Sequence, residues 1–136
     1  MRTQKIKTQI CDPTILNLQI LADIYGDESS ETIVAALSGF YQAAKPYITA
    51  LQQSFLEQDL SALSTVAHSL NGICGLTGVI RLATLCRQLE QAAKAKQKSV
   101  VSNLMAELTV HWPVLEKQLN FVLKQYGGAD AEGIIC

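Results

Sequence analysis

Hydrophobic residues recur along most of the chain at intervals of three and four, the spacing that places side chains on one side of an α-helix. Polar residues fill most of the remaining positions, as expected of helices that bury one face and expose the other. Short breaks in this pattern divide the chain into five segments. The pattern therefore predicts helices over residues 13–25, 30–58, 60–77, 79–96 and 100–126.

Residues that favour helix ends stand at most of these boundaries. Asp and Ser side chains accept hydrogen bonds from the free N–H groups of a first helical turn, and proline fits the first helical position. Glycine favours the end of a helix because it adopts left-handed backbone conformations without strain. The expected starts are Asp12-Pro13, Asp27, Ser29, Ser30, Asp59 and Ser99, and the expected stops are Gly26, Gly78 and Gly127-Gly128.

Two prolines fall inside predicted helices rather than between them. Pro46 lies within residues 30–58 and Pro113 within residues 100–126. A proline inside a helix removes one backbone hydrogen bond and bends the helix. We expect a kink at each site, near residues 109–112 in the second case, where a break into two helices is the alternative.

Four amphipathic helices joined by short loops pack most readily as an antiparallel up-down bundle. We therefore expect an all-α fold in which residues 30–126 supply a four-helix bundle, preceded by the additional helix 13–25. At 136 residues the chain is long enough for one domain with its own core. We assign residues 1–10 to an arm or linker, 11–126 to the helical domain and 127–136 to a flexible tail.

Composition narrows the classes of function. The chain has 11 basic and 12 acidic residues, a balance that argues against nucleic acid as a partner. The four cysteines form no CxxC motif, which favours a reduced, cytoplasmic location. No apolar run approaches the roughly 20 residues of a membrane-spanning helix, and the N-terminus lacks a signal-peptide core. We expect no direct membrane contact and, by default, a monomer.

The candidate functional residue is His68, in the stretch from Ala67 to Gly78. One side of this predicted helix is apolar, and His68 lies on the other side among small residues only. Glycine inside a helix costs roughly 1 kcal/mol relative to alanine, so two glycines beside one histidine suggest room for a partner. The alternative is that Gly75 ends the helix as its C-cap. The apolar residues are Leu63, Val66, Ala67, Leu70, Ile73 and Cys74, and the small ones are Ser61, Ser64, Thr65, Gly72 and Gly75.

A solvated imidazole is mostly neutral near pH 7 and is then a competent nucleophile toward phosphorus. The sequence contains no acidic metal-binding cluster, glycine-rich phosphate loop or Walker-type lysine, so we expect no independent kinase activity. A metal site formed by His68, Cys74, Cys86 and His111 is disfavoured, because Cys74 lies about 120° around the helix from His68.

Other conspicuous residues have simpler interpretations. We interpret His111 as a packing or capping residue, and Trp112 and Tyr126 as packing at the bundle end rather than a ligand cage. The lysines from Lys94 to Lys98 are interpreted as a solvated helix end.

The stretch around His68 resembles the signature of histidine phosphotransfer (HPt) domains, roughly Ala-His-x-Leu-Lys-Gly-Ser-x-x-x-x-Gly. The resemblance covers the chain from about Cys11 to Tyr126, and it continues through Leu82, Leu85, Cys86, Leu89 and Glu90. It implies that helix 13–25 lies across one end of the bundle.

The resemblance also implies a function. His68 would accept a phosphoryl group from the aspartate of a response-regulator receiver domain and pass it to another receiver, in a phosphorelay fed by a hybrid sensor kinase. The receiver would supply Mg²⁺, and this chain would bind no cofactor of its own. The residues expected to support the phosphoryl group are Ser64, Thr65, Asn71, Gly72 and Gly75.

The sequence departs from the family signature near the histidine. Asn71 stands where the family usually has lysine, Ile73 replaces its serine and Leu76 its frequent asparagine. An asparagine offers only a neutral donor, and the loss relative to lysine is of order 1 kcal/mol, so transfer would be slower but still possible.

Two alternatives remain open. The first is an interaction module that binds a receiver or kinase without being phosphorylated. The second is a structural bundle in which the glycine face is buried against another subunit.

Overall fold

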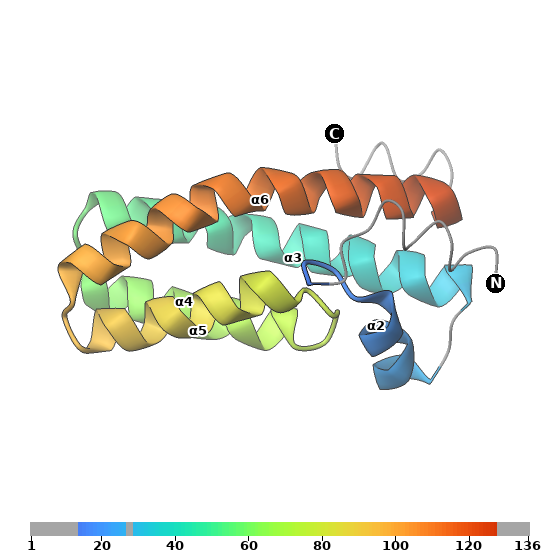
Figure 1. Ribbon diagram of the computed structural model, residues 1–136, viewed down its shortest axis with the longest axis horizontal. Helices are drawn as coiled ribbons and strands as arrows, with labels where there is room; N and C mark the ends of the chain where they lie inside the picture. Colours follow the sequence, from blue (N-terminus) through green and yellow to red (C-terminus); the bar gives the residue numbers. More distant parts are fainter. Residues whose placement is uncertain (1–13, 27–28, 128–136) are drawn as a thin grey trace.

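A computed structural model describes residues 14–26 and 29–127 of the chain, and the arm and tail proposed for its two ends lie mostly outside these residues. Every regular element in the described part is an α-helix, so the all-α prediction is confirmed (Figure 1). The elements are α2 (Leu18–Tyr25), α3 (Ser30–Leu56), α4 (Leu60–Cys74), α5 (Ile80–Lys94) and α6 (Lys98–Gly127).

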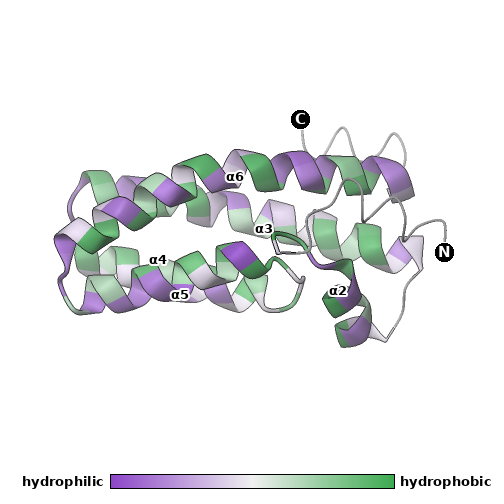
Figure 2. Cartoon of the chain, in the orientation of Figure 1, coloured by the Kyte–Doolittle hydropathy of each residue, from purple (hydrophilic) through white to green (hydrophobic). Residues whose placement is uncertain are grey.

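The four longer helices form the predicted bundle. The long helices α3 and α6 run side by side, α4 and α5 form a shorter pair beneath them, and α2 lies beside the α4–α5 loop at one end (Figure 1). Each helix carries hydrophobic residues on part of its circumference and hydrophilic ones on the rest (Figure 2). The buried side chains, mostly leucines, form one continuous core along the bundle.

Two of the predicted helix caps are confirmed. The Ser29 side chain accepts a hydrogen bond from the backbone N–H of Thr32 at the start of α3. The Asp59 side chain accepts one from the N–H of Ala62 at the start of α4. These local hydrogen bonds fix where both helices begin.

Two other helix starts differ from the prediction. Residues 14–17 are not helical, and α2 begins at Leu18 because the Asn17 side chain accepts hydrogen bonds from two N–H groups of the first turn. The proposed start at Asp12-Pro13 lies outside the described residues. Helix α6 begins at Lys98, so Ser99 lies within it and is not its cap. Val100, near the start of α6, is 40% exposed although it is hydrophobic.

The end of α4 also differs from the prediction. The helix ends at Cys74, not at Thr77, and Gly75 is its C-cap, as the alternative interpretation proposed. The N–H groups of Leu76 and Thr77 bond to carbonyls three residues earlier, which tightens the final turn. Gly78 then reverses the chain with a φ of +76°, a conformation that favours glycine.

Both prolines lie inside continuous helices. Helix α3 runs through Pro46 and α6 runs through Pro113, so the alternative that the last helix breaks in two is wrong. The expected kinks at these sites stay predictions.

The loop between α4 and α5 anchors the N-terminal helix. The backbone N–H of Asn17 donates a hydrogen bond of 2.8 Å to the carbonyl of Gly78. A Cβ atom at Gly78 would collide with the carbonyl oxygen of Asn17. The absence of a side chain at Gly78 thus lets the segment before α2 lie directly against this loop, at the end of the bundle nearest Gly75.

Across residues 14–26 and 29–127, none of the helices combines the length and the apolar character needed to cross a lipid bilayer.

Candidate functional site

His68 projects from the middle of α4 into solvent. The opposite side of the helix is fully buried at Leu63, Ala67 and Leu70, so α4 cannot rotate without exposing core residues. The His68 side chain is 73% exposed. The scaffold therefore holds an accessible imidazole on a fixed helix.

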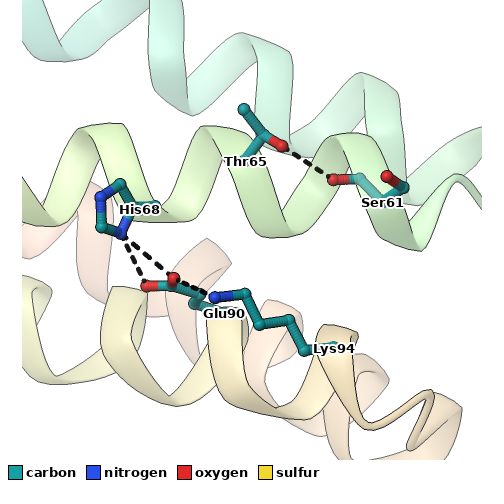
Figure 3. A network of polar contacts seen from close by, with 5 residues as sticks. All are labelled: Ser61, Thr65, His68, Glu90 and Lys94. Atoms are coloured by element: carbon teal, nitrogen blue, oxygen red, sulfur yellow. Dashed lines mark hydrogen bonds and ion pairs between the residues drawn. The ribbon is translucent and has the colours of Figure 1, made fainter.

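The imidazole contacts a carboxylate on the neighbouring helix. The Nδ1 atom of His68 lies 3.2 Å from Oε1 and 3.1 Å from Oε2 of Glu90, on α5 (Figure 3). One turn further along α5, Lys94 Nζ donates a hydrogen bond of 2.9 Å to Glu90 Oε2. The Glu90 side chain is only 15% exposed, and its carboxylate contacts both the His68 imidazole and the Lys94 ammonium group.

The charge of Glu90 decides which ring nitrogen is free. The hydrogen bond from Lys94 lowers the pKa of Glu90 below its usual value, and the contact with His68 lowers it further, against the raising effect of burial. An ionised carboxylate can only accept hydrogen bonds, so Nδ1 of His68 carries the proton. In the neutral ring the lone pair then lies on Nε2, the nitrogen that does not face Glu90.

The other predicted site residues differ in how they lie around His68. Thr65 is exposed, but its hydroxyl donates to the backbone carbonyl of Ser61 (Figure 3). Ser64 is only 7% exposed, so its hydroxyl lies away from the solvent around His68. Asn71 is partly exposed one turn beyond the histidine.

Gly72 and Gly75 are both exposed on the His68 side of the helix end. A Cβ atom at Gly72 would meet nothing within 4 Å, and one at Gly75 would make only ordinary contacts with backbone oxygens. Gly75 has a right-handed backbone with φ −63°, which any residue adopts. Neither glycine is therefore required by packing or backbone conformation within the described residues.

Sequence reasoning did not identify Glu90 and Lys94 as parts of the site. Glu90 entered only as part of a family pattern, and Lys94 was interpreted as a solvated helix end, whereas it pairs with Glu90. Their spacing of four within α5 was visible, but the contact with His68 depends on how α4 and α5 pack.

The described cysteines are part of the core. Cys74 on α4 and Cys86 on α5 are free and buried, as expected of cysteines on apolar helix faces. A hydrogen bond with Cys86, together with burial, raises the pKa of the Cys74 thiol. No group of three or more potential metal ligands occurs in the part of the chain that the structure describes.

The second histidine, His111, is buried, and its neighbour Trp112 packs against α3. His111 is 8% exposed and Trp112 stacks on Tyr41 of α3, with ring centroids 6.0 Å apart. The Tyr41 hydroxyl donates to Glu116 on α6, and Tyr126 is partly buried against the core. These contacts confirm the packing interpretation of all three predicted residues.

His111 is expected to make the fold sensitive to mild acid. Burial lowers its pKa from the usual 6.5, and the positive charge of Arg81 on α5 lowers it further. As the pH falls through 6.5, His111 binds a proton in the unfolded chain but not yet in the folded chain, which favours unfolding. The free energy of unfolding is therefore full above pH 6.5 and declines below it. Urea unfolding at pH 7.5 and 5.5 should show this decline, and His111→Gln should reduce it. An unchanged decline in the variant would contradict the assignment.

Comparison with known proteins agrees with the geometry. A family model described as "Hpt domain" matches residues 35–123, which include His68, both glycines and Glu90. No curated protein and no solved structure matches the chain. The matched region spans the four helices of the bundle almost completely, with the exposed histidine in its second helix. The chain therefore belongs to the Hpt domain family.

Proposed function

We propose that His68 accepts a phosphoryl group on Nε2 from the aspartyl phosphate of a receiver domain and passes it to the aspartate of another receiver. Membership of the Hpt family implies a histidine phosphotransfer carrier of phosphorelays, not an enzyme with its own turnover. The observation that carries the finer proposal is an exposed imidazole whose Nδ1 is held by Glu90.

The chemistry follows from that contact. The Nε2 lone pair attacks phosphorus, a P–N bond forms, and the P–O bond to the donor aspartate breaks, leaving its carboxylate with the electron pair. Since Nδ1 keeps its proton, the ring becomes positively charged as the bond forms. The Glu90 carboxylate stabilises that charge, and the onward transfer to the second aspartate is the same step in reverse.

The partner supplies what this chain lacks for the reaction. Mg²⁺, bound by the acidic pocket of the receiver, would neutralise charge on the phosphoryl oxygens. The surface at Gly72 and Gly75 has no side chains and supports close approach of such a pocket to His68. Packing within the chain does not require glycine at either position. We assign the donor receiver to a hybrid sensor kinase and the relay to the cytoplasm.

The direct test is incubation of the chain with a phosphorylated receiver and Mg²⁺, followed by intact mass measurement at neutral pH. One phosphoryl group should be added, and it should be lost in acid, as expected of phosphohistidine. A chain that binds the receiver but stays unphosphorylated would instead be an interaction module.

The charge of Glu90 has its own expected effect. Glu90→Gln keeps a hydrogen-bond acceptor but removes the charge that stabilises the ring, so transfer from the receiver should slow by about three- to ten-fold. Nitrogen NMR of the ring should also show a smaller share of the form protonated at Nδ1. Glu107→Gln is the matched control. Glu107 lies on α6 and pairs with Arg81, which is on another side of α5 from Glu90. Equal rates for wild type and Glu90→Gln would refute the role.

A further inference from the structure

The proposed phosphoryl site lacks a cation on its own helix. Asn71 is neutral, and the small residues around His68 carry no charge. A transferred phosphoryl group carries negative charge on three oxygens, and a nearby cation favours its binding and transfer. A cation supplied by this chain would therefore have to come from the neighbouring helix, on the side of the free ring nitrogen.

The register of the two helices places one basic residue on that side. Helices α4 and α5 are antiparallel neighbours, and the contact between His68 and Glu90 fixes how they are aligned (Figure 1). Arg87 precedes Glu90 by one turn, so it lies toward the C-terminal end of α4, alongside Asn71. Lys94 follows Glu90 by one turn and lies toward the N-terminal end of α4.

The orientation of the imidazole favours Arg87. Its Nδ1 faces Glu90, and its other nitrogen points away from both Glu90 and Lys94, toward the C-terminal part of α4 (Figure 3). A phosphoryl group on that nitrogen would extend in the direction of Arg87 and away from Lys94.

The charges of the other two basic residues of the helix are already engaged. Lys94 bonds to Glu90, and Arg81 forms an ion pair of 3.2 Å with Glu107 on α6. Arg87 is exposed, and its guanidinium donates to the hydroxyl of Thr84 on its own helix, at 3.5 Å. Within the described residues, no carboxylate pairs with Arg87.

We propose that Arg87 binds the phosphoryl group carried by His68, in the role for which the family signature has a lysine at the position of Asn71. The inference rests on the proposed function of His68. The guanidinium presents two parallel N–H donors that match the oxygens of a phosphoryl group, and its long side chain reaches across one helical turn. The cation that the family signature has on the helix of the histidine would thus be supplied here by the neighbouring helix α5.

The first test measures transfer from a phosphorylated receiver to the full chain. Arg87→Gln should slow transfer about five-fold, since a charge-assisted bond at an exposed site is lost. Arg87→Lys should retain most of the rate. Adding Asn71→Lys to Arg87→Gln should restore it, because the charge returns from the other helix. Arg81→Gln, which removes an arginine from the opposite side of α5, should leave transfer unchanged.

The second test needs no partner protein. Phosphoramidate phosphorylates histidine chemically, so His68 can be loaded in the isolated chain at neutral pH. The side-chain Nε–H NMR signal of Arg87 should shift on loading, and that of Arg81 should not. This readout reports contact with the phosphoryl group directly, which a purely structural arginine would not give.

The outcomes separate the two proposals. A receiver that loads His68 equally well in wild type and Arg87→Gln, with no shift of the Arg87 signal, overturns the inference and leaves the function intact. A shift on loading by phosphoramidate, with no transfer from any receiver, overturns the function and supports the inference. A His68 that neither reagent loads contradicts both.

Discussion

Replacing His68 with glutamine is expected to abolish phosphorylation of the chain by a phosphorylated receiver. Glutamine retains polar atoms of similar reach but offers no nitrogen lone pair that can attack phosphorus. Because His68 is 73% exposed and lies on the polar side of α4, its loss removes no core contact. Intact mass at neutral pH should therefore show no added phosphoryl group, while the unfolding midpoint stays close to that of the wild type.

His111→Gln is the matched control for this experiment. It removes the only other histidine of the chain, which is buried in α6. That variant should be phosphorylated like the wild type, although its stability changes. Phosphorylation that survives His68→Gln and disappears in His111→Gln would mean that His111 is the phosphorylated residue, and it would refute the proposed function.

Replacing Gly78 with alanine is expected to destabilise the protein by about 2 kcal/mol or more. An L-residue at φ +76° is strained by roughly 1–2 kcal/mol, and the added Cβ would also press on the backbone oxygen of Asn17. Urea unfolding measures the loss. Hydrogen exchange should in addition be faster in α2, because the bond from Asn17 to Gly78 anchors that helix.

Gly39→Ala provides the opposite case. Gly39 lies inside α3, and an added Cβ there meets nothing within 4 Å. Alanine should therefore stabilise the helix by up to about 1 kcal/mol. If the two glycine variants changed stability by the same amount, the backbone of Gly78 would not have the anchoring role described for it.

The helices were predictable because their signals are local. The three-to-four spacing of hydrophobic residues located all four bundle helices. Asp59 marked the start of α4 to the residue, and Ser29, the cap of α3, was one of three candidates for that position. The end of α4 was less certain for a physical reason. Glycine both permits a helix to continue and favours its end, so Gly75 was compatible with either.

The site was only half predictable. The exposure of His68 followed from the apolar stripe on the other side of its helix, since one helix fixes both faces. Which residues of α5 contact His68 depends on how α4 and α5 are aligned along their axes, to within a fraction of a turn. That alignment is set by core packing between α4 and α5, and a single sequence does not reveal it.

The start of α2 could not be read from its own segment either. Asp12-Pro13 and Asn17 are both suitable starts, and in the described residues the helix begins after the second. The choice is coupled to a loop 61 residues away, because Asn17 both caps α2 and bonds to Gly78. Long-range contacts of this kind override local preferences.

The stacking of Trp112 on Tyr41 gives the molecule an intrinsic optical reporter. The chain has a single tryptophan, so its tryptophan emission comes from one place, the seam between α3 and α6. His68 and Glu90 belong to the other helix pair. Emission during chemical denaturation would follow the separation of the long helices, and loading of the imidazole should leave the spectrum unchanged.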